Sequence, residues 1–222
     1  YDIPLIEDAA DALGSKYKGK HPGTFGLAGF YSFNGNKIIT TSGGGILVSN
    51  DLKLINKVKF WSTQARNNAA HYEHTEMGYN YRMSNVLAAI GRGQLKVLAD
   101  RVAQKREIFS RYQQSLCDLP GVSFMPEPDF AASCRWLTCL TVDPDKTTTD
   151  RDAIIRELER HNIESRPTWK PMHMQPLYKK YPIAGGSVAE HLFKYGLCLP
   201  SGTGMTLEEQ EYVIAVLQDC WN

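Results

Sequence analysis

The sequence lacks a long apolar run, an excess of charge of either sign and a paired-cysteine motif. Its 25 lysines and arginines nearly balance its 24 acidic residues, so charge does not point to nucleic acid or an anionic membrane as a partner. No apolar stretch approaches the roughly 20 residues of a transmembrane helix, and the first residues do not resemble a signal peptide. The five cysteines form no C-x-x-C pair, which predicts reduced thiols in a cytoplasmic protein: Cys117, Cys134, Cys139, Cys198 and Cys220.

The sequence gives little support for a P-loop nucleotide site or a metal site. Gly43–Gly45 lacks the Gly-Lys-Ser/Thr of a P-loop, and we interpret it as a turn where backbones approach closely. His71 and His74 have the spacing of a possible metal-ligand pair, but no third ligand is near in the sequence. Surface positions are therefore favoured over a metal site, and we predict no bound metal.

The first part of the sequence, residues 1–98, is typical of an α/β layer. Short apolar runs alternate with glycine-rich turns. The predicted strands are Ile3–Glu7, Ala28–Phe33 and Gly45–Ser49. Asp51 and Ser84 are predicted to cap two helices, with Gly91 and Gly93 in the second leaving room for a neighbouring backbone.

The second part, residues 99–222, is predicted to form a linking helix and a smaller α+β domain. Apolar residues recur at helical spacing from Leu95 to Leu116, as in an amphipathic helix. A strand is predicted at 136–142. Three helix starts carry an acidic residue three positions later, the pattern of a capping box: Thr149, Ser187 and Thr206.

Residues with the chemistry of a cofactor site lie at the ends of two predicted strands. Asp8 comes directly after the first strand, where open α/β sheets bind their ligands; Ser32 lies near the end of the second strand and Lys37 follows it. An acid for a protonated ring nitrogen, a hydroxyl for a phosphate and a lysine for an imine are groups that pyridoxal phosphate requires. By spacing alone, ordinary roles are favoured: a turn or helix cap for the acid and a solvated charge for the lysine.

Several motifs occur in a fixed order along the whole chain. They are Glu7-Asp8-Ala9-Ala10, Ser32-Phe33 with Lys37, Thr41–Gly45, Gly78–Asn85 and Arg166–His173. Together they resemble the DegT/DnrJ/StrS sugar aminotransferases. The resemblance implies a fold-type-I pyridoxal-phosphate-dependent transferase, in which this chain forms part of the large mixed or parallel-sheet domain and a small α+β C-terminal domain. It also implies a homodimer with shared active sites.

The resemblance assigns roles to individual residues. It implies that Lys37 is the Schiff-base lysine, that Asp8 pairs with the pyridine nitrogen and that Ser32 binds the cofactor phosphate. Asn80 would reach the phosphate of the other subunit. Asp11 belongs to the cofactor site, at a position where most members carry Gln or His.

Two residues of the later motifs are candidates for substrate binding. Arg82 could pair with a surface acid or face the phosphates of a sugar nucleotide, for which its planar fork is suited; we favour the phosphates. His173, between two methionines, is either a packed core histidine or a substrate-binding residue, and both interpretations remain open.

Finer features of the motifs indicate the substrate. Asp11, the Ser-Gly-Gly-Gly loop after Lys37 and the Trp169–His173 segment resemble the branch that aminates UDP-linked 4-keto-6-deoxy-hexosamines on the bacillosamine route. Glutamate is the expected amino donor, and surface-glycan or glycoprotein sugar biosynthesis is the expected setting. The alternatives are an aminotransferase for a 3-keto sugar nucleotide and a non-catalytic protein that keeps the fold for binding or regulation. Lys37 argues against the dehydrases of the family, which have histidine there.

One part of the family pattern is not found in this sequence. The glycine-threonine phosphate-binding turn and the aromatic residue that stacks on the cofactor ring precede the region that corresponds to Tyr1. We therefore expect upstream sequence in the complete enzyme. We also expect this chain alone to bind the cofactor weakly and its first part to associate or to be partly disordered.

Overall fold

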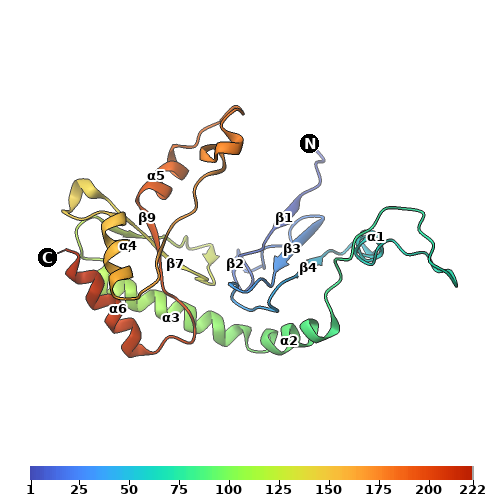
Figure 1. Cartoon of the computed structure of the whole chain (residues 1–222), viewed down its shortest axis with the longest axis horizontal. Coiled ribbons are helices and arrows are strands. Elements are labelled where there is room, and N and C mark those ends of the chain that lie inside the picture. The colour runs from blue at the N-terminus through green and yellow to red at the C-terminus, as the bar shows by residue number, and fades with distance from the viewer. Residues whose placement is uncertain (222) are drawn as a thin grey trace. The chain divides into compact units, whose positions relative to one another are not determined.

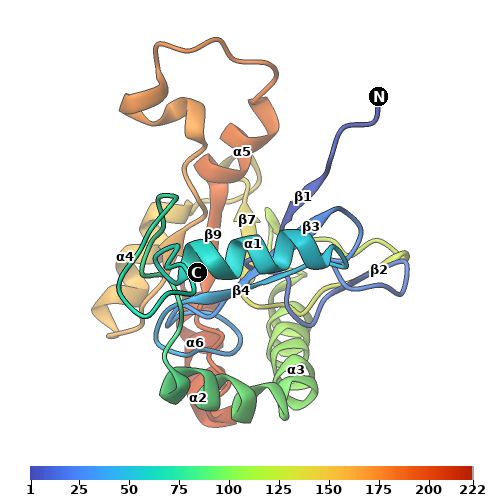
Figure 2. The ribbon, with the colours of Figure 1, turned by 90° about the vertical axis from the view of Figure 1, so that its right-hand side faces the viewer.

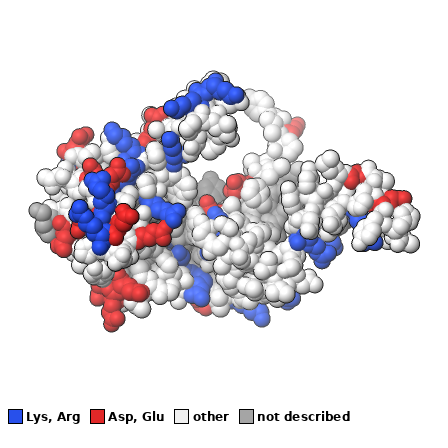
Figure 3. Space-filling view, in the orientation of Figure 1, with Lys and Arg blue, Asp and Glu red and all other residues white. Residues whose placement is uncertain are grey.

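The computed structural model describes residues 1–221, which form two compact units. Unit 1 contains Tyr1–Val102 and Glu127–Trp136, and unit 2 contains Ala103–Pro126 and the chain from Leu137 onward. The domain boundary at residue 98 stays a prediction. No helix in the described residues is long and apolar enough to cross a bilayer. Acidic and basic side chains are mixed on the face drawn in Figure 3, as the balanced composition leads one to expect.

Unit 1 is built on a three-stranded sheet in the order β1-β3-β4, drawn in Figure 1. β1 (Ile6–Asp8) runs parallel to β3 (Ala28–Ser32), and β4 (Gly45–Val48) runs antiparallel to β3. The two later strands confirm the prediction to within a residue. The prediction that the first strand begins at Ile3 is wrong, because pairing with β3 starts only at Ile6 and Pro4 has no N–H to donate to a ladder.

A second, smaller pairing in unit 1 joins residues that are distant in the sequence. β2 (Lys16–Tyr17) pairs antiparallel with β6 (Ala131–Ala132). Cys134 donates its N–H to Ser15 Oγ at 2.9 Å and its thiol contacts the carbonyl oxygen of Asp11 at 3.7 Å. These contacts hold the segment Glu127–Trp136 against the residues that follow β1.

The helices of unit 1 begin where their caps were predicted. Asp51 accepts the N–H groups of Lys53 and Leu54 at the start of α1 (Leu52–Ser62), and Ser84 accepts that of Leu87 in α2 (Asn85–Leu95). These bonds satisfy amide groups that have no partner within the helix. The longer α3 (Leu98–Leu116) follows α2 after two residues, as Figures 1 and 2 show.

The two glycines of α2 have different surroundings. A Cβ at Gly91 would lie 2.8 Å from Cγ2 of Thr41, whereas a Cβ at Gly93 would meet nothing within 4 Å. The expectation of close packing therefore applies at Gly91, where the neighbour is a side chain rather than backbone. It is wrong for Gly93.

Unit 2 contains a four-stranded sheet in the order β5-β7-β9-β8, antiparallel throughout. The predicted strand at 136–142 is observed as β7 from Thr138 to Val142. The other strands are β5 (Val122–Phe124), β8 (Arg166–Pro167) and β9 (Gly196–Leu199), the α-helices are α4 (Arg151–Arg160), α5 (Ser187–Tyr195) and α6 (Leu207–Asp219), and the 3₁₀ turns are η1 (Pro144–Lys146), η2 (Met172–Met174) and η3 (Pro176–Tyr178). The loop that carries η2 and η3 leads into α5 at the top of Figure 2.

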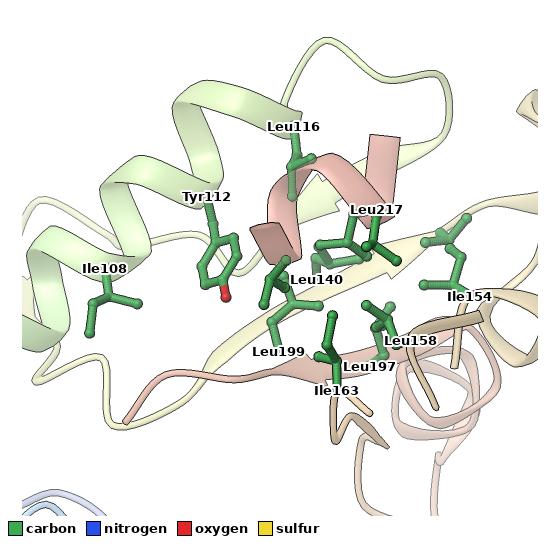
Figure 4. Close-up of a cluster of buried hydrophobic side chains, with 13 residues drawn as sticks. Ile108, Tyr112, Leu116, Leu140, Ile154, Leu158, Ile163, Leu197, Leu199 and Leu217 are labelled. Atoms are coloured by element: carbon green, nitrogen blue, oxygen red, sulfur yellow. The ribbon is translucent and has the colours of Figure 1, made fainter. Parts of the chain in front are cut away.

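The core of unit 2 lies between one face of this sheet and α3, α4 and α6. Figure 4 shows the apolar side chains of these helices pointing toward those of β7 and β9. Leu140, Ile154, Leu158 and Leu197 are all less than 5% exposed. The helical spacing of the apolar residues in α3 predicted this buried stripe.

Of the three predicted capping boxes in unit 2, one is confirmed. Thr206 and Glu209 bond each other's backbone N–H at the start of α6. The N-cap of α4 is Asp150, whose carboxylate accepts the N–H of Ala153 at 2.7 Å. The prediction that Thr149 is the N-cap is therefore wrong by one residue.

The prediction for α5 is also wrong. Ser187 is its first helical residue, and the N-cap is Gly186 with φ of +111° and no side-chain cap bond. The box does not form as predicted because the helix begins one residue earlier, with Gly186 as the N-cap; Glu190 Oε1 lies 2.8 Å from His173 Nε2.

Candidate active site

The predicted cofactor residues Asp8 and Ser32 lie on neighbouring parallel strands. Asp8 is the last residue of β1 and is in register with Phe30, two residues before Ser32 at the end of β3. Because both strands are parallel, their C-terminal ends meet at one edge of the sheet, which is where open α/β sheets bind ligands. The structure thus brings the acid and the hydroxyl to the same edge.

Glu7, which precedes Asp8, anchors this edge through a carboxylate that accepts three backbone N–H groups. The donors are Gly23 at 2.7 Å, Phe25 at 2.5 Å and Gly26 at 2.6 Å. Burial would raise the pKa of Glu7, but these bonds outweigh it and lower the pKa below the ordinary value of 4.5. Gly29, the partner of Glu7 in β3, has no room for a Cβ, which would lie 2.2 Å from the Gly23 carbonyl oxygen.

Lys37 lies in the loop after β3, and its amine pairs with the Asp11 carboxylate. The lysine side chain is 15% exposed and that of Asp11 is 54% exposed, so the ion pair is open to solvent on the aspartate side. The Lys37 N–H donates to the carbonyl oxygen of Asn34 at 3.1 Å, so residues 34–37 form a turn. The lysine and one acid of the predicted site, Lys37 and Asp11, are therefore in contact in unit 1.

Trp136 is a further residue at this site that the sequence did not indicate. Lys37 Nζ lies 4.4 Å from the centroid of the Trp136 ring, a cation–π distance, and the indole N–H donates to the Asn36 carbonyl oxygen at 2.7 Å. The prediction had assigned Trp136 to the start of a strand. Its contact could not be read from the sequence, because the tryptophan is about a hundred residues from the lysine and no spacing rule connects them.

Asn80 and Arg82 lie on a different part of unit 1. Asn80 forms an isolated β-bridge with Thr63, and the backbone N–H of Arg82 donates to the carbonyl oxygen of Ser62 at 3.1 Å. Both residues are exposed. Within residues 1–221 neither side chain makes a hydrogen bond or ion pair, and neither joins the group around Lys37.

The surface beside Asn80 is aromatic and apolar. Tyr79 and Tyr81 stack with ring centroids 5.0 Å apart. They line a pocket of about 410 Å³ whose other lining residues include Trp61 and Met77. Met77 and Tyr81 are more than three-quarters exposed.

The three histidines considered in the sequence have modest contacts. His173, in unit 2, is 19% exposed in its side chain and lies 2.8 Å from Glu190 through Nε2, outside the core cluster. His71 lies 3.4 Å from Glu73, and His74 Nδ1 lies 2.9 Å from the Gln64 carbonyl oxygen. The described residues contain no group of three His, Cys, Asp or Glu side chains placed to hold a metal ion.

The group around Lys37 fits pyridoxal phosphate. Asp8 accepts one hydrogen bond, from Ala10 N to Oδ1 at 3.1 Å, so acceptor positions remain for the N–H of a pyridinium. Ser32 Oγ accepts from Asn34 N at 3.2 Å, and its hydroxyl proton has no acceptor among the described residues, so it can donate to a phosphate. Together with the Lys37 amine, these are groups that the cofactor requires.

Comparison with known proteins identifies the family. The model of the DegT/DnrJ/EryC1/StrS aminotransferase family matches residues 1–218. The putative pyridoxal phosphate-dependent aminotransferase EpsN of Bacillus subtilis is 54% identical over 98% of this chain and 56% of its own length. The UDP-4-amino-4,6-dideoxy-N-acetyl-beta-L-altrosamine transaminase of Campylobacter jejuni is 32% identical, over 96% of this chain and 57% of its own length.

A solved structure agrees with these relatives. The aminotransferase TlmJ from Streptoalloteichus hindustanus matches 98% of this chain and 58% of its own chain, with a TM-score of 0.89 and 28% identity. This match confirms the predicted fold class, since the mixed α/β chain described above matches part of an aminotransferase chain. The chain spans somewhat more than half the length of the relatives that it matches. It belongs to the DegT/DnrJ/EryC1/StrS aminotransferase family.

Proposed function

We propose that the whole protein transfers an amino group from glutamate to a nucleotide-linked 4-keto-6-deoxy sugar in the cytoplasm, with pyridoxal phosphate as its cofactor. The observation that carries the proposal is the convergence of Lys37, Asp11 and Trp136 at the sheet edge that also bears Asp8 and Ser32. Family membership supports the reaction type. The setting that we propose is the biosynthesis of surface-glycan or glycoprotein sugars.

The residues of the site divide the work of the proposed reaction. Pyridoxal phosphate, when bound, supplies an aldehyde carbon for the amino group and a ring that withdraws electrons. The Lys37 amine takes the proton from the α-carbon of the donor and returns it to C4′ of the cofactor, acting first as a base and then as an acid. Asp8 keeps the ring nitrogen protonated through its carboxylate, and Ser32 donates its hydroxyl proton to the phosphate.

Asp11 and Trp136 would hold the Lys37 amine in position. The Asp11 carboxylate pairs with the amine, and the face of the Trp136 ring lies 4.4 Å from Nζ, at a cation–π distance. The amine must leave this ion pair when the cofactor binds. We propose that Asp11 positions the Lys37 amine at the sheet edge before the cofactor enters.

The homodimer with shared sites belongs to the same proposal. Asn80 and Arg82 are exposed, and their side chains make no hydrogen bond or ion pair in residues 1–221. The apolar pocket formed by Tyr79 and Tyr81 lies beside them. We propose that Asn80 binds the cofactor phosphate of a second subunit, and that Arg82 and His173 bind the sugar nucleotide.

The choice of a 4-keto sugar is supported by the motif pattern and by one relative. Asp11 and the Ser-Gly-Gly-Gly loop resemble the branch that acts on UDP-linked 4-keto-6-deoxy-hexosamines. The name of the Campylobacter jejuni relative describes a 4-amino-4,6-dideoxy sugar carried by UDP. An amino group at C4 of a 6-deoxy sugar is the product that transfer to a 4-keto-6-deoxy sugar would give.

The test is transfer of ¹⁵N from labelled glutamate by the full-length protein. A UDP-linked 4-keto-6-deoxy-hexosamine and a 3-keto sugar nucleotide are offered in separate reactions, and products are identified by mass spectrometry. We expect label in the first product alone, loss of transfer in Lys37→Ala, and normal transfer in the matched variant Lys16→Ala, whose lysine lies in β2. Label only in the product of the 3-keto sugar nucleotide would show that the proposed 4-keto substrate is wrong. Transfer by Lys37→Ala at the rate of the unsubstituted protein would refute the mechanism.

A further inference from the structure

Cys139 and Cys198 face each other across two strands of unit 2. They are in register on the antiparallel pair β7 and β9, and their sulfur atoms are 3.5 Å apart. Their neighbours in each strand, Leu140, Leu197 and Leu199, are at most 4% exposed and point into the core. Because side chains alternate along a strand, both thiols lie on the opposite face of the sheet, where they are half-buried.

The backbone geometry at this pair suits a covalent bond between the sulfurs. Met125 donates its N–H to the Cys139 carbonyl oxygen at 3.2 Å, so the polar groups of Cys139 point toward the β5 side of β7 and away from β9. Cys139 and Cys198 therefore form a non-hydrogen-bonded pair, in which Cα atoms are about 4.5 Å apart. Disulfides span Cα separations of roughly 4.4–6.8 Å, so the bond requires rotation of the thiols and little movement of the backbone.

We propose that Cys139 and Cys198 form a reactive dithiol site that is oxidised by small disulfides to a cross-strand disulfide. The Cys198 thiolate attacks a sulfur of the oxidant, forming a mixed disulfide and releasing one thiolate. The Cys139 thiolate then attacks the Cys198 sulfur and releases the second. Two protein thiols are oxidised, one small disulfide is reduced to two thiols, and the protons pass to solvent and the released thiolates.

The order of attack follows from the surroundings of the two thiols. The hydrogen bond from Cys139 lowers the pKa of the Cys198 thiol, although burial raises it. A lower pKa increases the thiolate fraction, which is the reacting form. The other cysteines lack a thiol neighbour: burial raises the pKa of Cys220, Cys134 is buried against the Asp11 carbonyl, and Cys117 is exposed beside Asp118.

The bond would also change the stability of unit 2. It would join strands whose cysteines are 59 residues apart, with α4 and α5 in the intervening chain. Closing a loop of this length restricts the unfolded chain. Oxidation is therefore expected to raise the midpoint of thermal unfolding, on the order of 10 °C, and reduction should reverse the change.

The test uses the full chain and oxidised glutathione, with peptide mapping under non-reducing conditions and a count of remaining thiols. We expect a peptide that links Cys139 to Cys198, a loss of two thiols and no glutathione on either residue. In Cys139→Ser, Cys198 should retain bound glutathione, because no second thiol is present to release it. Cys117→Ser is the matched control and should form the same link as the unmodified sequence.

Two results would overturn the proposal. One is glutathione attached separately to Cys139 and Cys198 without a link. The other is the absence of any reaction at this pair under conditions that modify Cys117. The peptide map of the unsubstituted chain shows whether the expected link or one of these two results is obtained, even if a serine variant does not fold.

Discussion

Glu7→Gln provides a sensitive test of how the sheet edge beside Asp8 is held. In the native chain Oε1 accepts from Phe25 and Gly26, and Oε2 accepts from Gly23. Glutamine keeps one acceptor oxygen and replaces the other by an amide NH₂. With the oxygen toward Phe25 and Gly26, the NH₂ would face the N–H of Gly23, so one bond is lost and two donors oppose each other.

The magnitude follows from the three bonds. Hydrogen bonds to a charged group contribute about 1.5–3 kcal/mol each and those to a neutral group about 0.5–1.5 kcal/mol. The Gly23 and Gly26 bonds are part-buried and the Phe25 bond is exposed, and solvent screens an exposed bond. After this discount we expect Glu7→Gln to lower the free energy of unfolding by about 2 kcal/mol at pH 7.

The pH dependence has a definite sign. The pKa of Glu7 is lowered in the folded chain, so its stabilising contribution is present above the ordinary value of 4.5 and is lost as the pH falls through the folded-state pKa. Urea unfolding of the full-length protein, followed by circular dichroism from pH 7 to pH 3, measures this. The difference between the native chain and Glu7→Gln should shrink on acidification.

The matched control is Glu211→Gln on α6. Glu211 is exposed, and its side chain makes no hydrogen bond or ion pair in the described part of the chain, so the change should stay within about 0.5 kcal/mol at every pH. A Glu7→Gln effect below about 0.5 kcal/mol at pH 7, or one that grows on acidification, would refute the anchoring role of this carboxylate.

Further substitutions test the helices, the core and the site. Gly93→Ala should stabilise α2 by up to about 1 kcal/mol through helix propensity. The free energy of unfolding of Gly91→Ala should be lower than that of Gly93→Ala by at least about 1 kcal/mol, because its Cβ meets a buried threonine; urea unfolding of both variants measures the difference. Tyr112→Phe should cost about 1 kcal/mol, since it removes the hydrogen bond to the Pro200 carbonyl oxygen, and a neutral result would mean that water replaces the phenol. Thr206→Ala should lower the free energy of unfolding by about 1 kcal/mol, because it removes the capping box of α6. A decrease below about 0.3 kcal/mol would show that the capping box does not stabilise the helix. In the full-length protein, Asp8→Asn should keep the fold and lower the rate of amino transfer by on the order of 100-fold or more. A near-normal rate would show that a residue other than Asp8 pairs with the ring nitrogen of the cofactor.

The sequence predicted the local elements well, because their signals are local. Asp51, Ser84 and Thr206 cap helices as expected, since a side-chain oxygen reaches amides two or three residues away. The errors are small shifts at the ends of elements, where neighbouring residues offer alternatives. Asp150 rather than Thr149 caps α4, and Gly186 rather than Ser187 is the N-cap of α5.

The site was predicted only in so far as its residues follow strand ends. Asp8 and Ser32 were placed at the ends of two strands, and the parallel pairing of β1 and β3 brings those ends together. The contacts of Glu7 and Trp136 depend on how loops return to the sheet, and neither periodicity nor a short motif encodes that return. The roles of all the predicted site residues stay predictions, because each depends on a ligand or a second subunit: Asp8, Asp11, Ser32, Lys37, Asn80, Arg82 and His173.

The central claim is that Lys37 carries the cofactor, and reduction of the holoenzyme tests it most directly. The full-length protein is incubated with pyridoxal phosphate, treated with borohydride and digested, and the modified peptide is identified by mass spectrometry. We predict a single adduct on Lys37, at the end of the loop that follows β3. An adduct on Lys16, Lys18 or Lys20 with Lys37 unmodified would contradict the account.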